Sequence, residues 1–181
     1  FEGIGEIGLE WLSEVKQATG LPIAVEVANR AHVECALKHN VDILWIGART
    51  TVSPFAVQEI AESLHDNKDV TVLIKNPMTP DIGLWAGAVN RLINEGVPVE
   101  NIGLIHRGFS YFGHSKYRNP PMWHMIFEMR SRFPEMMMIC DPSHICGCRP
   151  LLYGIAQQAA DLCFDGLIIE SHNDPDKAWS D

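Results

Sequence analysis

The stretch VTVLIKNPMTPDIGLWAGAVNRLINEGVPVENIGLIHRG, residues 70–108, decides the fold. It holds two short runs of mostly apolar residues, 70–74 and 101–105, and neither alternates with polar residues as a half-exposed strand would. Between the runs, apolar residues from Ile82 to Ile93 recur at helical spacing, and Gly96 follows as a helix stop. A buried strand, a helix and a second buried strand are typical of a parallel sheet.

The same alternation continues in both directions along the chain. Further apolar runs predict strands at 21–27, 41–46, 136–140 and 166–169. Helical patterns lie between them: a stripe through Ile7, Trp11, Leu12 and Val15, a short helix at 31–39, a helix that follows Pro54, and helices near 122–132 and 150–161. No internal linker interrupts this order, which predicts an α/β protein.

Polar side chains follow nearly every predicted strand. They are Glu26, Arg49, Lys75, Arg107, Asp141 with His144, and Glu170. A (β/α)8 barrel gathers its strand ends at one mouth, whereas an open doubly wound sheet places a Gly-rich phosphate loop at one switch point. Because no such loop follows any strand, we predict a (β/α)8 TIM barrel of which about six of the eight βα units are present.

Length and charge narrow the class of protein. The chain has 181 residues and a net charge of −9, which disfavours nucleic acid and anionic membrane surfaces as partners. A barrel of this kind normally needs about 250 residues, so we expect 1–181 to be a partial barrel domain. The five cysteines suggest no disulfide framework, and we expect a cytoplasmic protein.

Three basic residues stand at strand ends in this acidic chain. Arg49, Lys75 and Arg107 would together bind a compact polyanion such as a phosphorylated metabolite, with the backbone around Ala48 offering N–H groups. The alternative is that each pairs with a nearby carboxylate and closes the barrel end. Lys75 also permits a Schiff base with a carbonyl substrate.

A mixed set of nitrogen and oxygen donors lies toward the end of the chain. His144, Glu170 and Asp181 suit a divalent Mn, Fe, Co or Zn ion with a position left open for a substrate oxygen. The crowded His144-x-Cys146-x-Cys148 cluster is a weaker zinc alternative, because it lacks a second ligand pair.

The other histidines receive plainer interpretations. We predict surface or packing roles on helices for His32, His39, His65 and His124, and places lining the mouth for His106 and His172. His114 lies with Lys116 and Arg118 in the polar loop 110–119, which is long enough to act as a lid over substrate.

Five blocks of this sequence occur in the order and spacing of a known family. They are IGARTT at 46–51, VLIKN at 72–76, HRG at 106–108, DPSH at 141–144, and GLIIE at 166–170 followed by NDPDKAWSD at 173–181. With them the chain resembles the 3-deoxy-7-phosphoheptulonate (DAHP) synthases, from about residue 21 onward.

The resemblance implies an enzyme that condenses phosphoenolpyruvate with erythrose 4-phosphate and releases phosphate. Arg49, Lys75 and Arg107 would then hold phosphoenolpyruvate. His144, Glu170 and Asp181 would be three of four ligands to a divalent metal. Asp141 and Glu26 would act beside them, orienting these groups or handling protons.

Two elements of the family pattern are not in these 181 residues: a Cys metal ligand in the first strand and a Lys-Pro-Arg-Thr loop after the second. We therefore expect the first two strands and the C-terminal end of the barrel to lie outside the sequence. His106 stands where many members have Glu, and Cys148, beside Arg149, stands where they have a second Arg.

Alternative functions remain open on the sequence. The sister synthase of 3-deoxy-octulosonate 8-phosphate uses arabinose 5-phosphate, and a barrel fragment without catalytic activity is a rival of another class. The resemblance also implies a homo-oligomer, and the stretch 111–134 resembles forms that carry a fused chorismate mutase domain.

Overall fold

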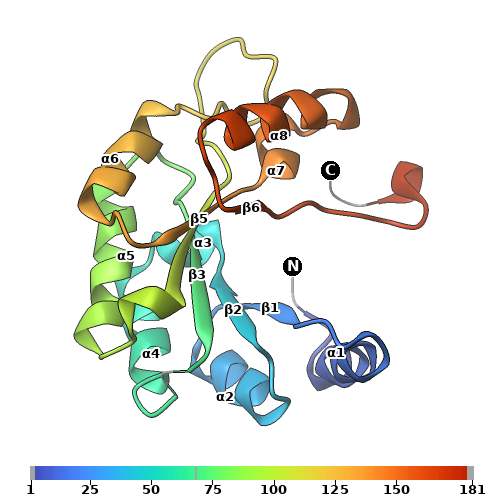
Figure 1. Ribbon diagram of the computed structural model, residues 1–181, viewed down its shortest axis with the longest axis vertical. Coiled ribbons are helices and arrows are strands. Elements are labelled where there is room, and N and C mark those ends of the chain that lie inside the picture. Colours follow the sequence, from blue (N-terminus) through green and yellow to red (C-terminus); the bar gives the residue numbers. More distant parts are fainter. Residues whose placement is uncertain (1–2, 68, 179–181) are drawn as a thin grey trace.

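The computed structural model describes residues 3–67 and 69–178, and its centre is one sheet of six parallel strands (Figure 1). The strands are β1 (Ala24–Val27), β2 (Ile43–Ile46), β3 (Thr71–Lys75), β4 (Ile102–His106), β5 (Met137–Cys140) and β6 (Gly166–Leu167). They are hydrogen-bonded in the order β1-β2-β3-β4-β5-β6. A doubly wound sheet reverses its strand order, so this consecutive order confirms the prediction of a partial (β/α)8 barrel.

Helices connect the strands. The longer ones are α1 (Glu6–Thr19), α2 (Arg30–Lys38), α4 (Pro54–Ser63), α5 (Ile82–Asn94), α6 (His124–Arg132) and α8 (Leu152–Asp161). Two short helices, α3 (Ala48–Thr51) and α7 (Pro142–Cys146), and the 3₁₀ turns η1 (Val99–Asn101), η2 (Arg149–Leu151) and η3 (Pro175–Lys177) were not predicted. No helix among the described residues is long and apolar enough to cross a membrane.

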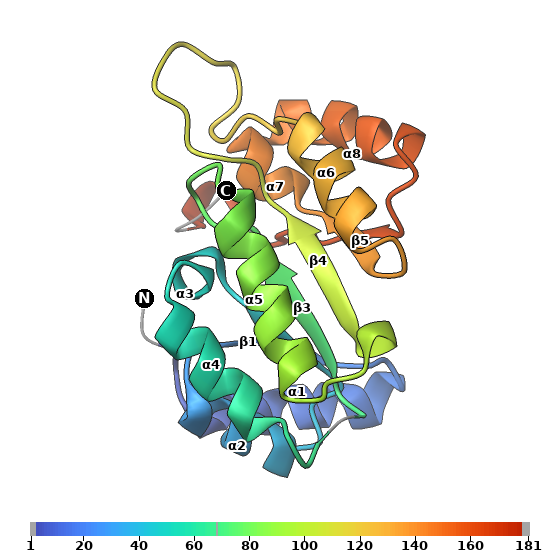
Figure 2. The same ribbon diagram turned by 90° about the vertical axis from the view of Figure 1, so that its left-hand side faces the viewer.

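The βαβ stretch of residues 70–108 forms the centre of the fold. In the β3–β4 pair Val72 lies beside Ile102 and Ile74 beside Leu104, and all four side chains are buried. Helix α5 packs over β3 and stands in front of that strand in Figure 2. The indole Nε1 of the buried Trp85 donates to the carbonyl of Ile74 at 3.1 Å, which fixes the height of α5 along the sheet.

The strand ends differ from the sequence prediction at the outer strands. The predicted strand 21–27 begins only at Ala24. Before it, the backbone N–H groups of Asp42 and Ile43 both donate to Ile23, and Ile23 donates to the Asp42 carboxylate. The predicted strand 166–169 is shortened to Gly166–Leu167.

The face of the sheet away from the helices is only partly covered. Met137, which points to this face from β5 beside Gly103, is 44% exposed. Leu73 lies on the same face and is buried, because it fills the space that a Cβ on Gly103 would occupy. The central strands therefore have a buried helix side and a half-open inner side, while at the edge strand β6 Leu167 is 44% exposed on the helix side.

Candidate active site

A cleft of about 880 Å³ opens where the strands end. Every site residue that the sequence predicted within the described chain lines it: Glu26, Ala48, Arg49, Lys75, Arg107, Asp141, His144 and Glu170. Asp181 lies outside the described residues. The parallel strands thus bring side chains separated by up to 144 positions to one mouth, as the barrel topology requires.

A buried ion pair lies at the centre of the cleft. Lys75 Nζ lies 2.9 Å from Asp141 Oδ2, and the side chains are 10% and 2% exposed. The backbone N–H of Asp141 donates to the carbonyl of His106 at 2.7 Å, which fixes the carboxylate at the end of β5. Burial by itself raises the pKa of Asp141, but the neighbouring His144 and Lys75 outweigh it and lower the pKa to about 2. Asp141 is therefore a fixed anion at neutral pH.

Helix α7 positions His144 beside two carboxylates. Asp141 is the N-cap of this helix, and its Oδ1 accepts the backbone N–H of His144 at 3.0 Å. His144 Nδ1 lies 2.9 Å from Asp141 Oδ2 and 3.5 Å from Glu170 Oε1. This buried nitrogen has no aligned hydrogen-bond partner in the described part of the chain. An unsatisfied imidazole nitrogen beside a carboxylate fits the donors that a divalent transition metal prefers.

Glu170 reaches this place by a contact that the sequence did not predict. Its backbone N–H donates to Ser143 Oγ at 3.0 Å. The segment that follows β6 is thereby fastened to α7, which carries His144. The fastening keeps the two predicted ligands on neighbouring elements together.

Two asparagines hold Arg107, and sequence reasoning missed the role of both. The backbone N–H of Arg107 donates to Asn76 Oδ1 at 2.7 Å, and its Nη1 donates to Asn119 Oδ1 at 3.0 Å. The amide Nδ2 of Asn119 donates in turn to the carbonyl of His144 at 2.7 Å. Asn119 therefore joins the guanidinium of Arg107 to the turn that carries His144. Asn76, directly after a lysine at a strand end, was the one visible signal.

The last residue of the loop 110–119, Asn119, packs against Gly108 at the edge of the site. This glycine has φ 73°, and a Cβ on it would lie 2.0 Å from the carbonyl oxygen of Asn119. The middle of the loop projects beyond the strand ends in Figure 1, in yellow, while Arg118 and Asn119 line the cleft. The lid role predicted for this loop stays a prediction.

Arg49 and Glu26 are more exposed to solvent than Lys75. Arg49 is exposed on the short helix α3, and Glu26 is exposed at the end of β1. Glu26 Oε2 accepts the indole N–H of Trp45 at 3.3 Å, and Oε1 lies where a Cβ on Gly47 would be. The Glu26 side chain therefore lies over Gly47, a contact that the sequence did not reveal.

The prediction that His106 lines the mouth is wrong. Its side chain is fully buried on the helix side of β4, against the rings of Phe109, Trp123 and Phe164. Burial lowers the pKa of His106 to about 3. His172 is exposed and lies outside the lining of the cleft.

The zinc alternative at His144-x-Cys146-x-Cys148 gains no support. Cys146 is buried and Cys148 is exposed. Within residues 3–67 and 69–178 their ligand atoms do not gather with that of His144 into a group of three.

Known proteins are similar to this chain in sequence and in fold. Phospho-2-dehydro-3-deoxyheptonate aldolase from Thermotoga maritima is 29% identical over 182 residues, which cover all of this chain and 51% of that protein. A crystal structure of the T. maritima enzyme, also called DAHP synthase, superposes with a TM-score of 0.85 at 26% identity over 98% of this chain and 50% of that one. A truncated form of 3-deoxy-D-arabino-heptulosonate 7-phosphate synthase from T. maritima gives 0.83 at 24% identity, over 99% of this chain and 64% of that one, and supports the fold alone.

The chain spans about half the length of the curated relative that it matches. The sequence pattern of the DAHP synthetase I family, in contrast, matches all of residues 1–181. The consecutive parallel strands and the cleft at their ends agree with that match. This chain belongs to the DAHP synthetase I family.

Proposed function

We propose that the intact protein condenses phosphoenolpyruvate with erythrose 4-phosphate to give 3-deoxy-7-phosphoheptulonate and phosphate, with a divalent metal as cofactor. One observation carries the proposal. Three cations from consecutive strands, Arg49, Lys75 and Arg107, line the same cleft as His144 and Glu170. Membership of the family and the names of the T. maritima relatives support it.

The cations would bind the phosphate and carboxylate of phosphoenolpyruvate. Lys75 is held by Asp141 and Arg107 by Asn119, so both charges are in place before a ligand arrives. A preorganised charge loses little conformational freedom on binding, which favours affinity. Arg49 is exposed and would complete the contact from the other side of the cleft.

His144, Glu170 and Asp181 would hold the metal, and Asp181 lies outside the described residues. The bound metal would polarise the aldehyde of the sugar phosphate as a Lewis acid. Asp141 would orient the imidazole of His144 through its two contacts with that residue. Asp141 and Glu26 are also the carboxylates near enough to handle the protons of the water that replaces phosphate.

The ion pair argues against a Schiff base on Lys75. A lysine attacks a carbonyl as the free amine. The Asp141 carboxylate at 2.9 Å in a buried site favours the ammonium form instead. Borohydride reduction in the presence of substrate should therefore leave Lys75 unmodified.

The test is consumption of phosphoenolpyruvate by the intact protein with erythrose 4-phosphate or arabinose 5-phosphate, before and after chelation. We expect turnover with the erythrose compound, loss on chelation, and recovery with added metal. His144→Ala should abolish turnover, whereas the matched control His124→Ala, at an exposed helix position, should retain it.

Other outcomes reassign the protein. Turnover with arabinose 5-phosphate alone would favour the sister synthase. Turnover that survives exhaustive chelation would refute the metal assignment. No turnover with either sugar in a folded intact protein would favour a barrel without catalytic activity.

A further inference from the structure

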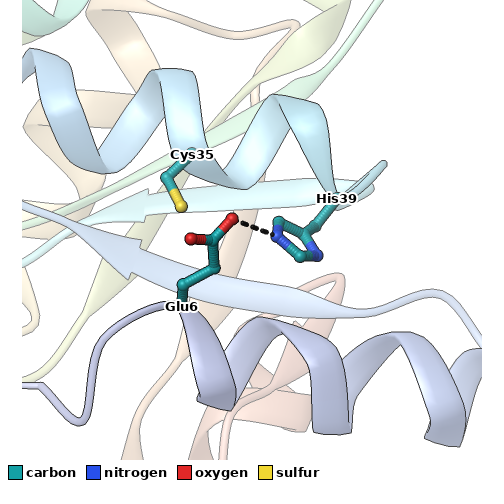
Figure 3. Close-up of side chains that lie close together, drawn as sticks. All are labelled: Glu6, Cys35 and His39. Atoms are coloured by element: carbon teal, nitrogen blue, oxygen red, sulfur yellow. Dashed lines mark hydrogen bonds and ion pairs between the residues drawn. The ribbon is translucent and has the colours of Figure 1, made fainter.

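A second group of metal-binding side chains lies away from the cleft. Glu6 from the first turn of α1 meets Cys35 and His39 at the end of α2, and one ligand atom of each lies within 4.8 Å of the others (Figure 3). The Cys35 thiol and the His39 imidazole both point toward the Glu6 carboxylate in this view. His39 Nε2 is 2.9 Å from Glu6 Oε1.

The geometry of α2 places two of the donors together. Cys35 and His39 are four residues apart, so they lie on one face of the helix end. His39 is the C-cap, and its backbone N–H donates to the carbonyl of Cys35 at 3.3 Å. The C-terminal end of a helix carries a partial negative charge that stabilises a nearby cation. The third donor comes from an element 33 positions away in the sequence.

This cluster is at the opposite end of the sheet from the cleft. Helix α2 leads into the beginning of β2 at Ile43, whereas Arg49 and the cleft follow the end of that strand. None of the three residues lines the cleft. A cation bound here would therefore be separate from the metal of the proposed reaction.

The donor set selects the kind of ion. A thiolate and an imidazole favour zinc and similar metals over magnesium and calcium, which prefer oxygen alone. Zinc bonds of about 2.0–2.3 Å in a tetrahedron need ligand atoms about 3.3–3.8 Å apart. The present separations, from 2.9 Å to at most 4.8 Å, reach that geometry with small side-chain movements.

We propose that Glu6, Cys35 and His39 bind one Zn²⁺ ion, with water as the fourth ligand, and that the ion fastens α1 to α2. The Glu6 side chain is 63% exposed and that of His39 is 19% exposed, so the ion enters and the water binds on the Glu6 side. Without a metal, an exposed Glu–His pair contributes little to stability.

The experiment measures the binding of cobalt and zinc to the intact protein carrying His144→Ala. This substitution removes a ligand of the metal site proposed for catalysis. Co²⁺ should produce the near-ultraviolet charge-transfer band of a cobalt–thiolate bond. Cys35→Ser in the same background should remove the band, whereas the matched control Cys163→Ser, at another non-disulfide cysteine, should retain it. Zinc should raise the Tm of the His144→Ala protein and leave that of the Cys35→Ser variant unchanged.

Glu6→Gln separates ligand loss from misfolding, because this exposed residue tolerates substitution. We expect it to weaken zinc binding by at least about tenfold, the smallest loss typical even of groups that only support a ligand. Unchanged zinc affinity in Glu6→Gln, or an undiminished cobalt band in Cys35→Ser, overturns the proposal. These readouts do not involve turnover, so they hold whether or not the proposed synthase activity is found.

Discussion

Charged residues at the ends of the central strands are buried, whereas those that follow the outer strands are more exposed. At the ends of β3, β4 and β5 stand Lys75, Arg107 and Asp141. Each of these residues, counted with its backbone, is at most 8% exposed, and each has a defined partner. Arg49 after β2 is exposed on a short helix, and Glu170 after β6 keeps a side chain that is 36% exposed. A buried charge is costly unless it is paired, so the central groups must be fixed, while the outer ones can move to meet a ligand.

The largest effect should follow from breaking the central ion pair. Asp141→Ala leaves the Lys75 ammonium buried without its partner, and removal of one member of a buried pair costs about 3–5 kcal/mol. Urea unfolding should show this loss. The matched control Glu26→Ala removes an exposed carboxylate of an outer strand and should change the free energy of unfolding by less than about 0.5 kcal/mol. Equal losses in the two variants would contradict the contrast between central and outer strands.

A smaller effect should come from His106 on the helix side of β4. Burial lowers the pKa of His106 to about 3, below its ordinary value of 6.5, so the unfolded chain binds a proton first as the pH falls. Folding stability should therefore decrease below pH 6.5, by about 2 kcal/mol at pH 5 from this group alone. His106→Phe should flatten the profile, and the exposed-site control His124→Phe should not. Urea titrations between pH 5 and 7.5 measure it, and identical slopes in the two variants would refute the buried-histidine explanation.

The smallest change in stability should belong to an outer strand. Arg49→Ala removes an exposed side chain and should alter the free energy of unfolding by less than about 0.5 kcal/mol. Under the proposed function it should still weaken phosphoenolpyruvate binding by about tenfold, because hydrogen bonds to charged groups contribute about 1.5–3 kcal/mol. Calorimetric titration of phosphoenolpyruvate tests this, with the exposed Arg132→Ala as control. Normal binding by Arg49→Ala would remove Arg49 from the phosphate site.

The strand order and the gathering of the strand ends could be predicted because both follow from unbroken apolar runs. The same feature explains the error at His106. A strand buried on both faces shows no alternation in its sequence, so nothing indicates which residue points to the cleft and which to the helices. Arg107 and His106 are neighbours, yet one lines the cleft and the other packs among aromatic rings.

Contacts between segments that are distant in the chain could not be predicted from the sequence. Asn119 reaches Arg107 across 12 positions and the carbonyl of His144 across 25, through a loop whose return depends on the backbone of Gly108. Glu6 meets His39 only because α1 packs beside the end of α2. Short helices such as α3 and α7 were missed because so few residues carry no periodicity.

The amide of Asn119 has a consequence for how ligands communicate. Its oxygen faces the guanidinium of Arg107 and its nitrogen faces the turn of His144, so one planar group of fixed width spans both. An anion that displaces Arg107 would pull on that turn through Asn119, and a cation that draws His144 would pull on the guanidinium. Linkage of this kind is reciprocal: each ligand would change the affinity for the other by the same factor.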